Sequence, residues 1–253
     1  MSVTPNELTD QVALVTGASS GIGEATAEAL AANGASVALA ARREDDLEAL
    51  ADRIESEGGD ALVVPTDVTD EDQVENMIET THEELGRLDI LVNNAGVMLL
   101  ERVDEASPEN FRQMAEVNLL GLMNATHAAL PIMQEQGEGH IVNLSSVAGR
   151  KAIPGSSAYN ATKFGVNGFT EALRQEVTGE DAIRTTLIEP GAVDTELPEH
   201  IPSDDQQDGI QGMMESMAPL TGEDIARSIL YAVTQPAHVD VNEILIRPTE
   251  QEL

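Results

Sequence analysis

The segment AYNATKFG, residues 158–165, carries one of only two lysines in a chain with 46 acidic residues and 13 Lys plus Arg. Tyr159 and Lys163 share one face of a predicted helix at 156–178, because side chains four residues apart are neighbours on a helix. A free phenol, with a pKa of about 10, exchanges protons poorly near neutrality. An ammonium group nearby stabilises the phenolate, so we expect Lys163 to lower the pKa of Tyr159 for acid–base catalysis. An exposed tyrosine beside a salt-bridging lysine has the same spacing, so other motifs in the chain must distinguish a catalytic pair from a surface pair.

A glycine-rich turn near the N-terminus is the second feature of the sequence that could have a chemical function. The stretch TGASSGIGEA, residues 16–25, directly follows an apolar strand pattern and opens a helical one. Glycines there let the backbone approach a diphosphate closely, and the helix N-terminus presents unpaired N–H groups to it. An ordinary strand-to-helix turn is the alternative. The strand–turn–helix context with Gly17, Gly21 and Gly23 favours nucleotide binding.

Apolar runs of strand length alternate with helical patterns along the chain. The predicted strands are 11–17, 36–41, 61–66, 89–94, 140–146, 183–190 and 242–248, and the predicted helices are 21–33, 43–57, 70–85, 107–136, 156–178 and 221–234. The strands are almost continuously apolar, which is typical of strands buried on both faces of a parallel sheet. We therefore predict an α/β fold, a doubly wound seven-stranded parallel sheet with helices on both faces (Rossmann fold). We expect a single dinucleotide-binding and catalytic domain over 1–253, with an irregular substrate-lid segment at about 196–224.

Three motifs in this order resemble the short-chain dehydrogenase/reductase family. They are TGxxxGxG at 16–23, NNAG at 93–96 and YxxxK at 159–163, and PGAVDT at 190–195 extends the likeness along the chain. The resemblance implies an oxidoreductase that interconverts a carbonyl and an alcohol by hydride transfer from a nicotinamide cofactor.

The resemblance also implies a catalytic set of Asn118, Ser146, Tyr159 and Lys163. Family spacing selects the serine thirteen residues before the tyrosine, so Ser146 would polarise the carbonyl while Ser145 faces the other way. Tyr159 would protonate the substrate oxygen, and Lys163 would also hold the nicotinamide ribose. Asn118 would keep a water chain open between Lys163 and solvent.

The end of the second strand bears on the choice of dinucleotide. Enzymes that use NAD typically carry an acid there to bind the ribose, whereas the implied alignment places Ala41 at that position, followed by Arg42 and Arg43. Two guanidinium groups suit a 2′-phosphate, so we expect NADP(H); ion pairs with the acids at 44–46 are the alternative. The resemblance assigns the cofactor to Gly17, Ser19, Ser20, Gly21, Ile22, Gly23, Arg42, Arg43, Asp67, Val68, Asn94, Ala95, Gly96, Tyr159, Lys163, Pro190, Gly191, Val193 and Thr195. Asp67 could otherwise cap the helix that follows it.

The substrate is expected to be a small-molecule carbonyl or alcohol selected by the 196–224 segment. Its Met213, Met214 and Met217 form either a flexible apolar surface or the packed face of a helix. The C-terminal VNEILIRPTEQE is similar to a branch with NADP-dependent 3-hydroxy acid dehydrogenases and broad carbonyl reductases. A 3-oxoacyl-carrier-protein reductase is an alternative, as are a non-catalytic NADP-sensing regulator and a sugar-nucleotide epimerase or dehydratase.

Composition excludes several other classes. The absence of cysteine excludes thiolate nucleophiles and Cys-based metal sites, and the five histidines lack paired metal-ligand spacing, so we expect no metal. Only His200, within the lid segment, is placed to meet substrate. No apolar run of membrane-spanning length and no signal-like N-terminus is apparent, so we expect a cytoplasmic protein without a membrane partner. Family members commonly form tetramers, so a homotetramer or homodimer is expected.

The net charge of −33 also excludes nucleic acid as a partner, because phosphate contacts need clustered Lys and Arg. The acids are scattered along the chain, whereas an acidic tail for a basic partner would concentrate them in one block. At molar salt the Debye length is about 3 Å, so dispersed carboxylates repel one another little. The pattern favours a salt-adapted protein over one with a basic partner.

Salt adaptation predicts low activity and partial unfolding below roughly 0.5 M salt, where screening of the carboxylates weakens. Circular dichroism and activity measured across a potassium chloride series check this. Full stability and activity in dilute buffer would contradict it.

Overall fold

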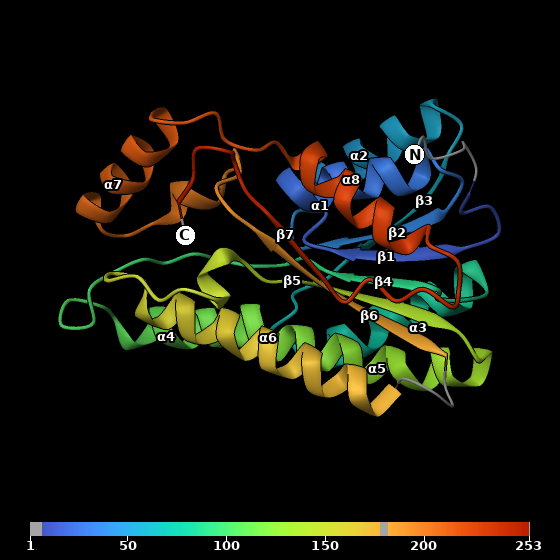
Figure 1. Cartoon of the computed structure of the whole chain (residues 1–253). Coiled ribbons are helices and arrows are strands. Elements are labelled where there is room, and N and C mark those ends of the chain that lie inside the picture. The colour runs from blue at the N-terminus through green and yellow to red at the C-terminus, as the bar shows by residue number, and fades with distance from the viewer. Residues whose placement is uncertain (1–6, 178–181, 253) are drawn as a thin grey trace.

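The computed structural model describes residues 7–177 and 182–252, and its centre is a seven-stranded parallel sheet (Figure 1). The strand order is β3-β2-β1-β4-β5-β6-β7. Successive strands are therefore added in one direction from β1 to β3 and in the opposite direction from β4 to β7. The strands are β1 (Val12–Thr16), β2 (Ser36–Ala41), β3 (Asp60–Pro65), β4 (Ile90–Asn93), β5 (Gly139–Leu144), β6 (Ile183–Pro190) and β7 (Glu243–Ile246). The predicted doubly wound fold is confirmed, and each predicted strand is present.

Burial of the strands on both faces explains their continuous apolar sequences. All five residues of β1 are buried. Ala13 and Val15 belong to one apolar cluster, while Leu14 between them belongs to a second cluster on the opposite face. Side chains alternate across a strand, so a strand covered on both sides needs apolar residues at every position.

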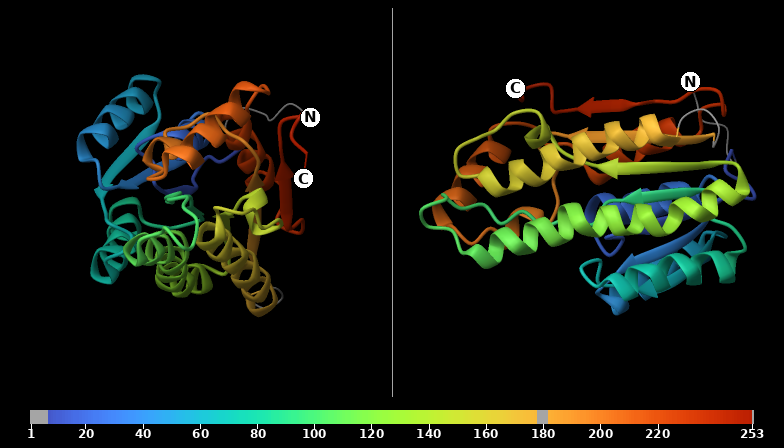
Figure 2. Two further views of the ribbon diagram at one scale, coloured as in Figure 1. Left: turned by 90° about the vertical axis from the view of Figure 1, so that its left-hand side faces the viewer. Right: turned by 90° about the horizontal axis from the view of Figure 1, so that it is seen from below.

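Two layers of helices cover the sheet (Figure 2). The first apolar cluster joins one face to α1 (Gly21–Ala31), α2 (Glu44–Ser56) and α8 (Gly222–Val233). The second cluster joins the other face to α3 (Glu71–Leu85), α5 (Gly121–Gln136) and α6 (Ser157–Val177). The predicted helix at 156–178 ends at residue 178, which lies outside the described residues. Among the described residues, no helix has the length and apolarity needed to cross a bilayer.

The predicted helix at 107–136 is interrupted by one wide turn. It begins as expected, with the Ser107 side chain accepting from the N–H of Glu109 and Pro108 in the first turn. After α4 (Pro108–Ala115), the segment Glu116–Leu120 forms a π-helical turn before α5 continues. Such turns are rare and occur mainly at functional sites. The uninterrupted helix of the prediction is therefore wrong at this one turn, which contains Asn118.

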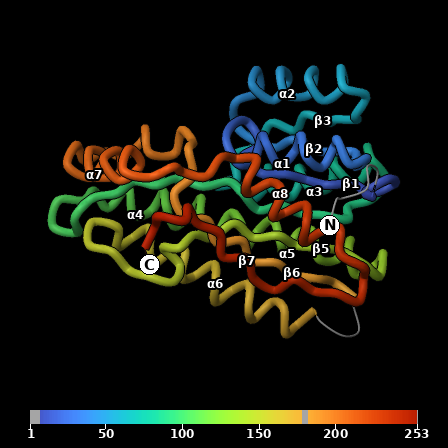
Figure 3. Tube along the Cα trace, turned by 45° about the horizontal axis from the view of Figure 1, so that its top comes forward, coloured from blue at the N-terminus to red at the C-terminus, as the bar shows by residue number. Residues whose placement is uncertain are grey.

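The lid segment is more regular than predicted. A 3₁₀ turn at Leu197–His200 and the helix α7 (Asp204–Glu215) lie within 196–224. The prediction of an irregular segment is therefore wrong over α7. The alternative of a helix packed by its methionines is correct in part, because Met213 and Met214 lie in α7 and are half-buried, whereas Met217 follows the helix. No residue of α7 is fully buried, so its sequence lacks the strong apolar stripe that identifies other helices. Figures 1 and 3 show α7 beyond the carboxyl ends of the strands, apart from both helical layers.

Candidate active site

A cleft of about 520 Å³ lies at the carboxyl ends of the strands, next to helix α7. In open parallel sheets, ligands bind at this edge, where the strand order reverses. The predicted residues that line it are Gly17, Ser19, Ser20, Gly21, Ile22, Arg42, Arg43, Asp67, Val68, Asn94, Ala95, Gly96, Ser146, Tyr159, Lys163, Pro190, Gly191, Val193 and Thr195. Gly23 and Asn118 are buried beside the cleft and do not line it.

The glycine-rich turn is packed so closely that side chains are excluded from it. Gly17 has a φ of 66°, and a Cβ atom there would lie 2.8 Å from the Cα of Ala95. A Cβ atom on Gly23 would lie 2.2 Å from the carbonyl oxygen of Gly17. Helix α1 begins at Gly21, at the lip of the cleft. Its N-terminus and the bare turn form a cradle suited to a diphosphate.

A hydrogen-bonded clamp fixes this turn to the end of the neighbouring strand β4. The Thr16 hydroxyl accepts from the N–H groups of Asn94 and Ala95 at 3.0 and 3.1 Å. The Asn94 side chain donates to the carbonyl oxygens of Thr16 and Gly17 at 2.9 and 3.1 Å. The clamp explains why the first and second sequence motifs are adjacent in space. Thr16 belongs to the first motif, but no feature of the sequence indicated its role as a clamp.

The two adjacent arginines have different environments. Arg43 pairs with Asp46 at 3.0 Å and Glu196 at 3.3 Å, so the ion-pairing interpretation is correct for this residue. It also donates to the Ser20 hydroxyl at 2.8 Å, which places its guanidinium across the glycine-rich turn. Arg42 lines the cleft, is exposed, and makes no ion pair with any residue of 7–177 or 182–252. Its guanidinium is therefore available to a ligand.

Asp67 lines the cleft near Arg42. Its carboxylate accepts from the N–H and hydroxyl of Thr69, at 3.0 and 2.8 Å. Partial burial acts to raise the pKa of Asp67, but these bonds and the charge of Arg42 hold it below its ordinary value. The side chain that caps α3 is that of Asp70, which accepts from the N–H of Gln73 at 3.1 Å. Asp67 is thus left facing the cleft.

Ser146, Tyr159 and Lys163 meet on the other side of the cleft. Ser146 begins the short turn Val147–Gly149, and its hydroxyl accepts from the N–H of Ala148 at 3.1 Å. The Lys163 Nζ lies 5.8 Å from the centre of the Tyr159 ring. That Nζ donates to the carbonyl oxygen of Leu144, the last residue of β5, at 2.9 Å. Tyr159 and Lys163 are only 8% and 5% exposed, which excludes the interpretation as a surface pair.

Burial reverses the expected pKa shift of the tyrosine. Desolvation raises the pKa of Tyr159 to about 12, although a hydrogen bond with Ser146 acts to lower it. The expected net lowering of this pKa is therefore wrong for the protein alone, because removal from water disfavours the phenolate more strongly than its neighbours favour it. Desolvation likewise lowers the pKa of Lys163 to about 8. Tyr159 is thus a fully protonated donor at neutral pH, and Lys163 titrates not far above neutrality.

Asn118 links the π-helical turn to the loop after β4 and to α6. Its side chain accepts from the N–H of Val97 at 2.7 Å and donates to the carbonyl oxygen of Val97 at 2.9 Å. It also donates to the Thr162 hydroxyl at 3.3 Å. The Thr162 hydroxyl in turn donates to the carbonyl oxygen of Tyr159 at 2.8 Å. Asn118 is therefore hydrogen-bonded to Thr162, which lies between Tyr159 and Lys163 in the same helical turn.

The cleft includes residues near the C-terminus that the sequence did not indicate. The Gln251 side chain accepts from the N–H of Ala192 at 2.9 Å and lines the cleft. The N–H of Gly191 donates to the carbonyl oxygen of Ile246 at 2.8 Å. Both contacts fix the predicted nicotinamide-side loop, and no motif marks them. His200 lines the cleft as expected.

A doubly wound sheet with a glycine-rich turn and a buried tyrosine–lysine pair in one cleft defines a dinucleotide-binding oxidoreductase. A family model described as short chain dehydrogenase matches residues 11–206. The chain therefore belongs to the short-chain dehydrogenase/reductase family, as the sequence motifs predicted.

Three similar proteins illustrate the family likeness. An uncharacterized oxidoreductase of Staphylococcus saprophyticus is 43% identical over 251 residues, covering 98% of this chain and 100% of the relative. The closed form of a serine dehydrogenase complexed with NADP+ has a TM-score of 0.89 and 34% identity, covering 96% and 97% of the two chains. An alcohol dehydrogenase from Thermococcus sibiricus complexed with 5-hydroxy-NADP has a TM-score of 0.86 and 32% identity, covering 96% and 98%. Similar structures hold either NADP or NAD, so family likeness alone does not choose the dinucleotide.

The depressed pKa of Lys163 can be tested without any assumption about the reaction. The chain has two lysines, so the Lys163 Cε signal can be assigned in carbon-13 NMR by its loss in Lys163→Arg, with Lys151→Arg as the matched control. Because burial disfavours the ammonium, the assigned signal should titrate at about 8, below the ordinary 10.5. A Lys163 signal that titrates above pH 10 would contradict the buried site.

Proposed function

We propose that the protein is an NADP(H)-dependent oxidoreductase that interconverts a carbonyl and an alcohol by hydride transfer. The observation that carries this proposal is the shared cleft of the glycine-rich turn, the free guanidinium of Arg42 and the buried pair Tyr159 and Lys163. Arg42 supports NADP(H) over NAD(H), because a guanidinium suits a 2′-phosphate and the chain carries no acid at Ala41.

The residues that would hold the cofactor fall into two groups. The glycine-rich turn and the N-terminus of α1 would bind the diphosphate, while Arg42 would bind the 2′-phosphate. Pro190, Gly191, Val193 and Thr195 follow β6 and line the opposite part of the cleft, where we expect the nicotinamide. When bound, the reduced nicotinamide supplies a hydride to the carbonyl carbon.

Protein side chains would supply the proton and polarise the oxygen. Ser146 would donate a hydrogen bond to the carbonyl oxygen, which stabilises the negative charge that develops there. Tyr159, with a pKa of about 12, would give its proton to that oxygen as the alcohol forms. Lys163 would stabilise the resulting phenolate and would hold the nicotinamide ribose. Its pKa of about 8 suits it to pass on a proton near neutral pH.

Asn118 supports resupply of that proton. Its side chain bridges Val97, in the loop after β4, and the Thr162 hydroxyl, next to Lys163 in α6. We infer that it holds the surrounding backbone open for water that connects Lys163 with solvent. The π-helical turn supports this inference, because such turns are rare and are frequently found at functional sites.

The lining beside Tyr159 indicates an uncharged, largely apolar substrate. Beyond the residues assigned to the cofactor and to catalysis, the described lining includes the apolar residues Val97, Met98, Leu100, Ala148, Ile153, Leu197, Ile210, Met213 and Met214 and the polar residues Ser156, Glu196, His200 and Gln251. The cations of the cleft within the described residues are Arg42, Arg43 and Lys163, with His200 at the lid. No guanidinium stands among the apolar residues to hold a substrate carboxylate. The lining therefore favours a ketone, an aldehyde or a 3-oxo ester over a free 3-oxo acid.

The reaction is tested by NADPH oxidation at high salt with ketones, aldehydes and 3-oxo esters, comparing wild type with Tyr159→Phe. Removal of the proton donor should lower kcat by roughly 10² to 10⁴ and leave the Kd for NADPH within about threefold. Retained reduction in the variant would overturn the mechanism. NADPH binding without any turnover would instead indicate a dinucleotide sensor, and product isomerisation without net NADPH loss would indicate an epimerase.

The cofactor preference is tested by Arg42→Asp, with the exposed Arg102→Asp as the charge-matched control. A charge-assisted hydrogen bond of about 1.5–3 kcal/mol corresponds to about a tenfold to hundredfold change in binding. The Arg42 variant should lose that much NADPH affinity and gain affinity for NADH, while the control should change neither. An unchanged ratio of the two affinities in Arg42→Asp would contradict the assignment.

A further inference from the structure

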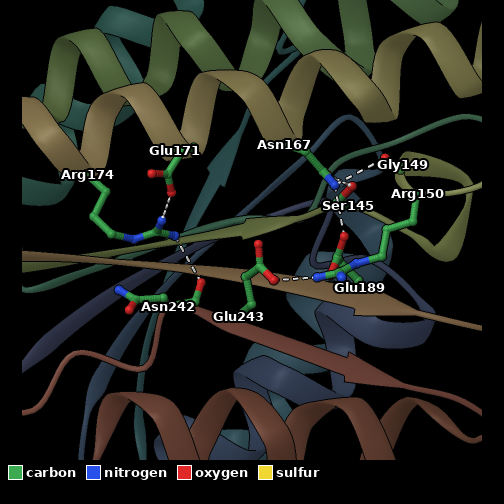
Figure 4. Close-up of polar contacts among 9 residues, drawn as sticks. All are labelled: Ser145, Gly149, Arg150, Asn167, Glu171, Arg174, Glu189, Asn242 and Glu243. Atoms are coloured by element: carbon green, nitrogen blue, oxygen red, sulfur yellow. Dashed lines mark hydrogen bonds and ion pairs between the residues drawn. The ribbon is translucent and has the colours of Figure 1, made fainter.

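A network of polar side chains lies directly behind the catalytic groups (Figure 4). It consists of Ser145, Arg150, Asn167 and Glu189, and we refer to it as the Glu189 network. Glu189 is the residue before Pro190 at the end of β6, and it is 0% exposed. A charged side chain is rarely buried so completely unless its partners fix its position.

Both carboxylate oxygens of Glu189 have partners. The Arg150 Nε donates to Oε2 at 2.6 Å, and a second guanidinium nitrogen lies 2.5 Å from the same oxygen. The Asn167 amide donates to Oε1 at 2.8 Å. Figure 4 shows Arg150 and Asn167 approaching the carboxylate from opposite sides. The carboxylate thus connects the turn after β5 with helix α6.

The network continues from Asn167 to the backbone of the catalytic residues. The Ser145 hydroxyl donates to the Asn167 side-chain oxygen at 2.5 Å and lies 3.3 Å from the carbonyl oxygen of Lys163. The Asn167 amide also reaches the carbonyl oxygen of Gly149 at 3.2 Å. A Cβ atom on Gly149 would lie 2.7 Å from both the Asn167 and the Ser145 side-chain oxygens, so there is no free space around them.

These contacts join three segments that each carry a group of the active site. Ser145 precedes Ser146, Asn167 lies one helical turn after Lys163, and Glu189 precedes Pro190. We propose that Glu189 and Asn167 are positioning residues that fix Ser146 and Lys163 relative to each other and to the nicotinamide-side loop. The proposal rests on the proposed function, since it concerns the geometry of that same site.

The chemistry is sensitive to this geometry. The Lys163 Nζ is held by the carbonyl oxygen of Leu144, next in sequence to Ser145, so a shift of α6 along β5 would displace it. A misplacement of about 1 Å between reacting groups can cost about 10²-fold in rate. Loss of one link in the network would therefore reduce turnover even though none of its members needs to touch the substrate.

A merely structural role would give a different result. Buried ion pairs contribute little net stability, and their loss acts mainly through the unpaired partner that is left behind. Removal of the Asn167 side chain leaves the pair of Arg150 and Glu189 intact and breaks the links from Asn167 to Glu189, Ser145 and Gly149. A structural role would thus lower the melting temperature without a selective effect on kcat.

The test compares Asn167→Ala and Ser145→Ala with wild type, and uses Glu243→Gln as the control. Glu243, on β7 and half-exposed, pairs with the outer side of Arg150 and has no contact with Asn167 or Ser145. Each variant is assayed for kcat, for the Kd of NADPH and for the melting temperature at high salt. The carbon-13 signal of the Lys163 Cε is recorded in parallel.

We expect kcat to fall about tenfold to hundredfold in Asn167→Ala and Ser145→Ala, with the Kd of NADPH within about threefold. The Lys163 signal should move in both variants, and the Glu243→Gln control should match wild type in every readout. Unchanged kcat and an unmoved Lys163 signal in folded variants would overturn the positioning role. If wild type oxidises no NADPH, the proposed reaction fails, and the NMR signal alone decides whether the network positions Lys163. If Asn167→Ala does not fold, kcat and the Lys163 signal of Ser145→Ala, which is the smaller change, decide whether the network has a positioning role.

Discussion

The hydrogen bond from the Lys163 Nζ to the carbonyl oxygen of Leu144 is the contact on which the candidate site depends. An ammonium group that is 5% exposed has lost most of its water, and its pKa falls to about 8 as a result. The end of β5 replaces part of that water with the carbonyl oxygen of Leu144. Tyr159 loses its water in the same pocket, which raises its pKa to about 12. The low polarity of the pocket thus keeps the phenol as a proton donor and brings the lysine closer to neutrality.

The parallel sheet explains why this pocket can exist next to a charged cofactor cradle. Its carboxyl ends gather the glycine-rich turn after β1, the arginines after β2 and the catalytic segment after β5 at one edge. The cradle carries the guanidinium groups, while the part beneath α7 is apolar. One edge of the sheet therefore presents a part with guanidinium groups and an apolar part side by side. Arg42, Arg43 and Lys163 line the cleft together with the acids Asp67 and Glu196, whereas the chain as a whole carries a net charge of −33.

The sequence predicted those features that depend on local chemistry. Apolar runs identified the strands because both faces are buried, and the spacing of glycines and of Tyr159 and Lys163 located the cleft. The features that it did not predict depend on distant contacts. The π-helical turn is stabilised by bonds between Asn118 and Val97, 21 residues away. Gln251 reaches a loop 59 residues away, and the pKa of Tyr159 follows from burial, which spacing alone does not reveal.

In the proposed reaction, a hydride passes from the nicotinamide to a carbonyl carbon while the protein supplies the proton. The most direct measurement determines the deuterium content of the alcohol product. Two samples of NADPH, each deuterated at C4 on a different face of the ring, are incubated separately with the enzyme and a neutral ketone at high salt. The account predicts an alcohol with deuterium on its carbinol carbon from one of the two labelled cofactors and none from the other. An alcohol without deuterium from either cofactor, or no alcohol from any ketone in the series while NADPH binds, would contradict it.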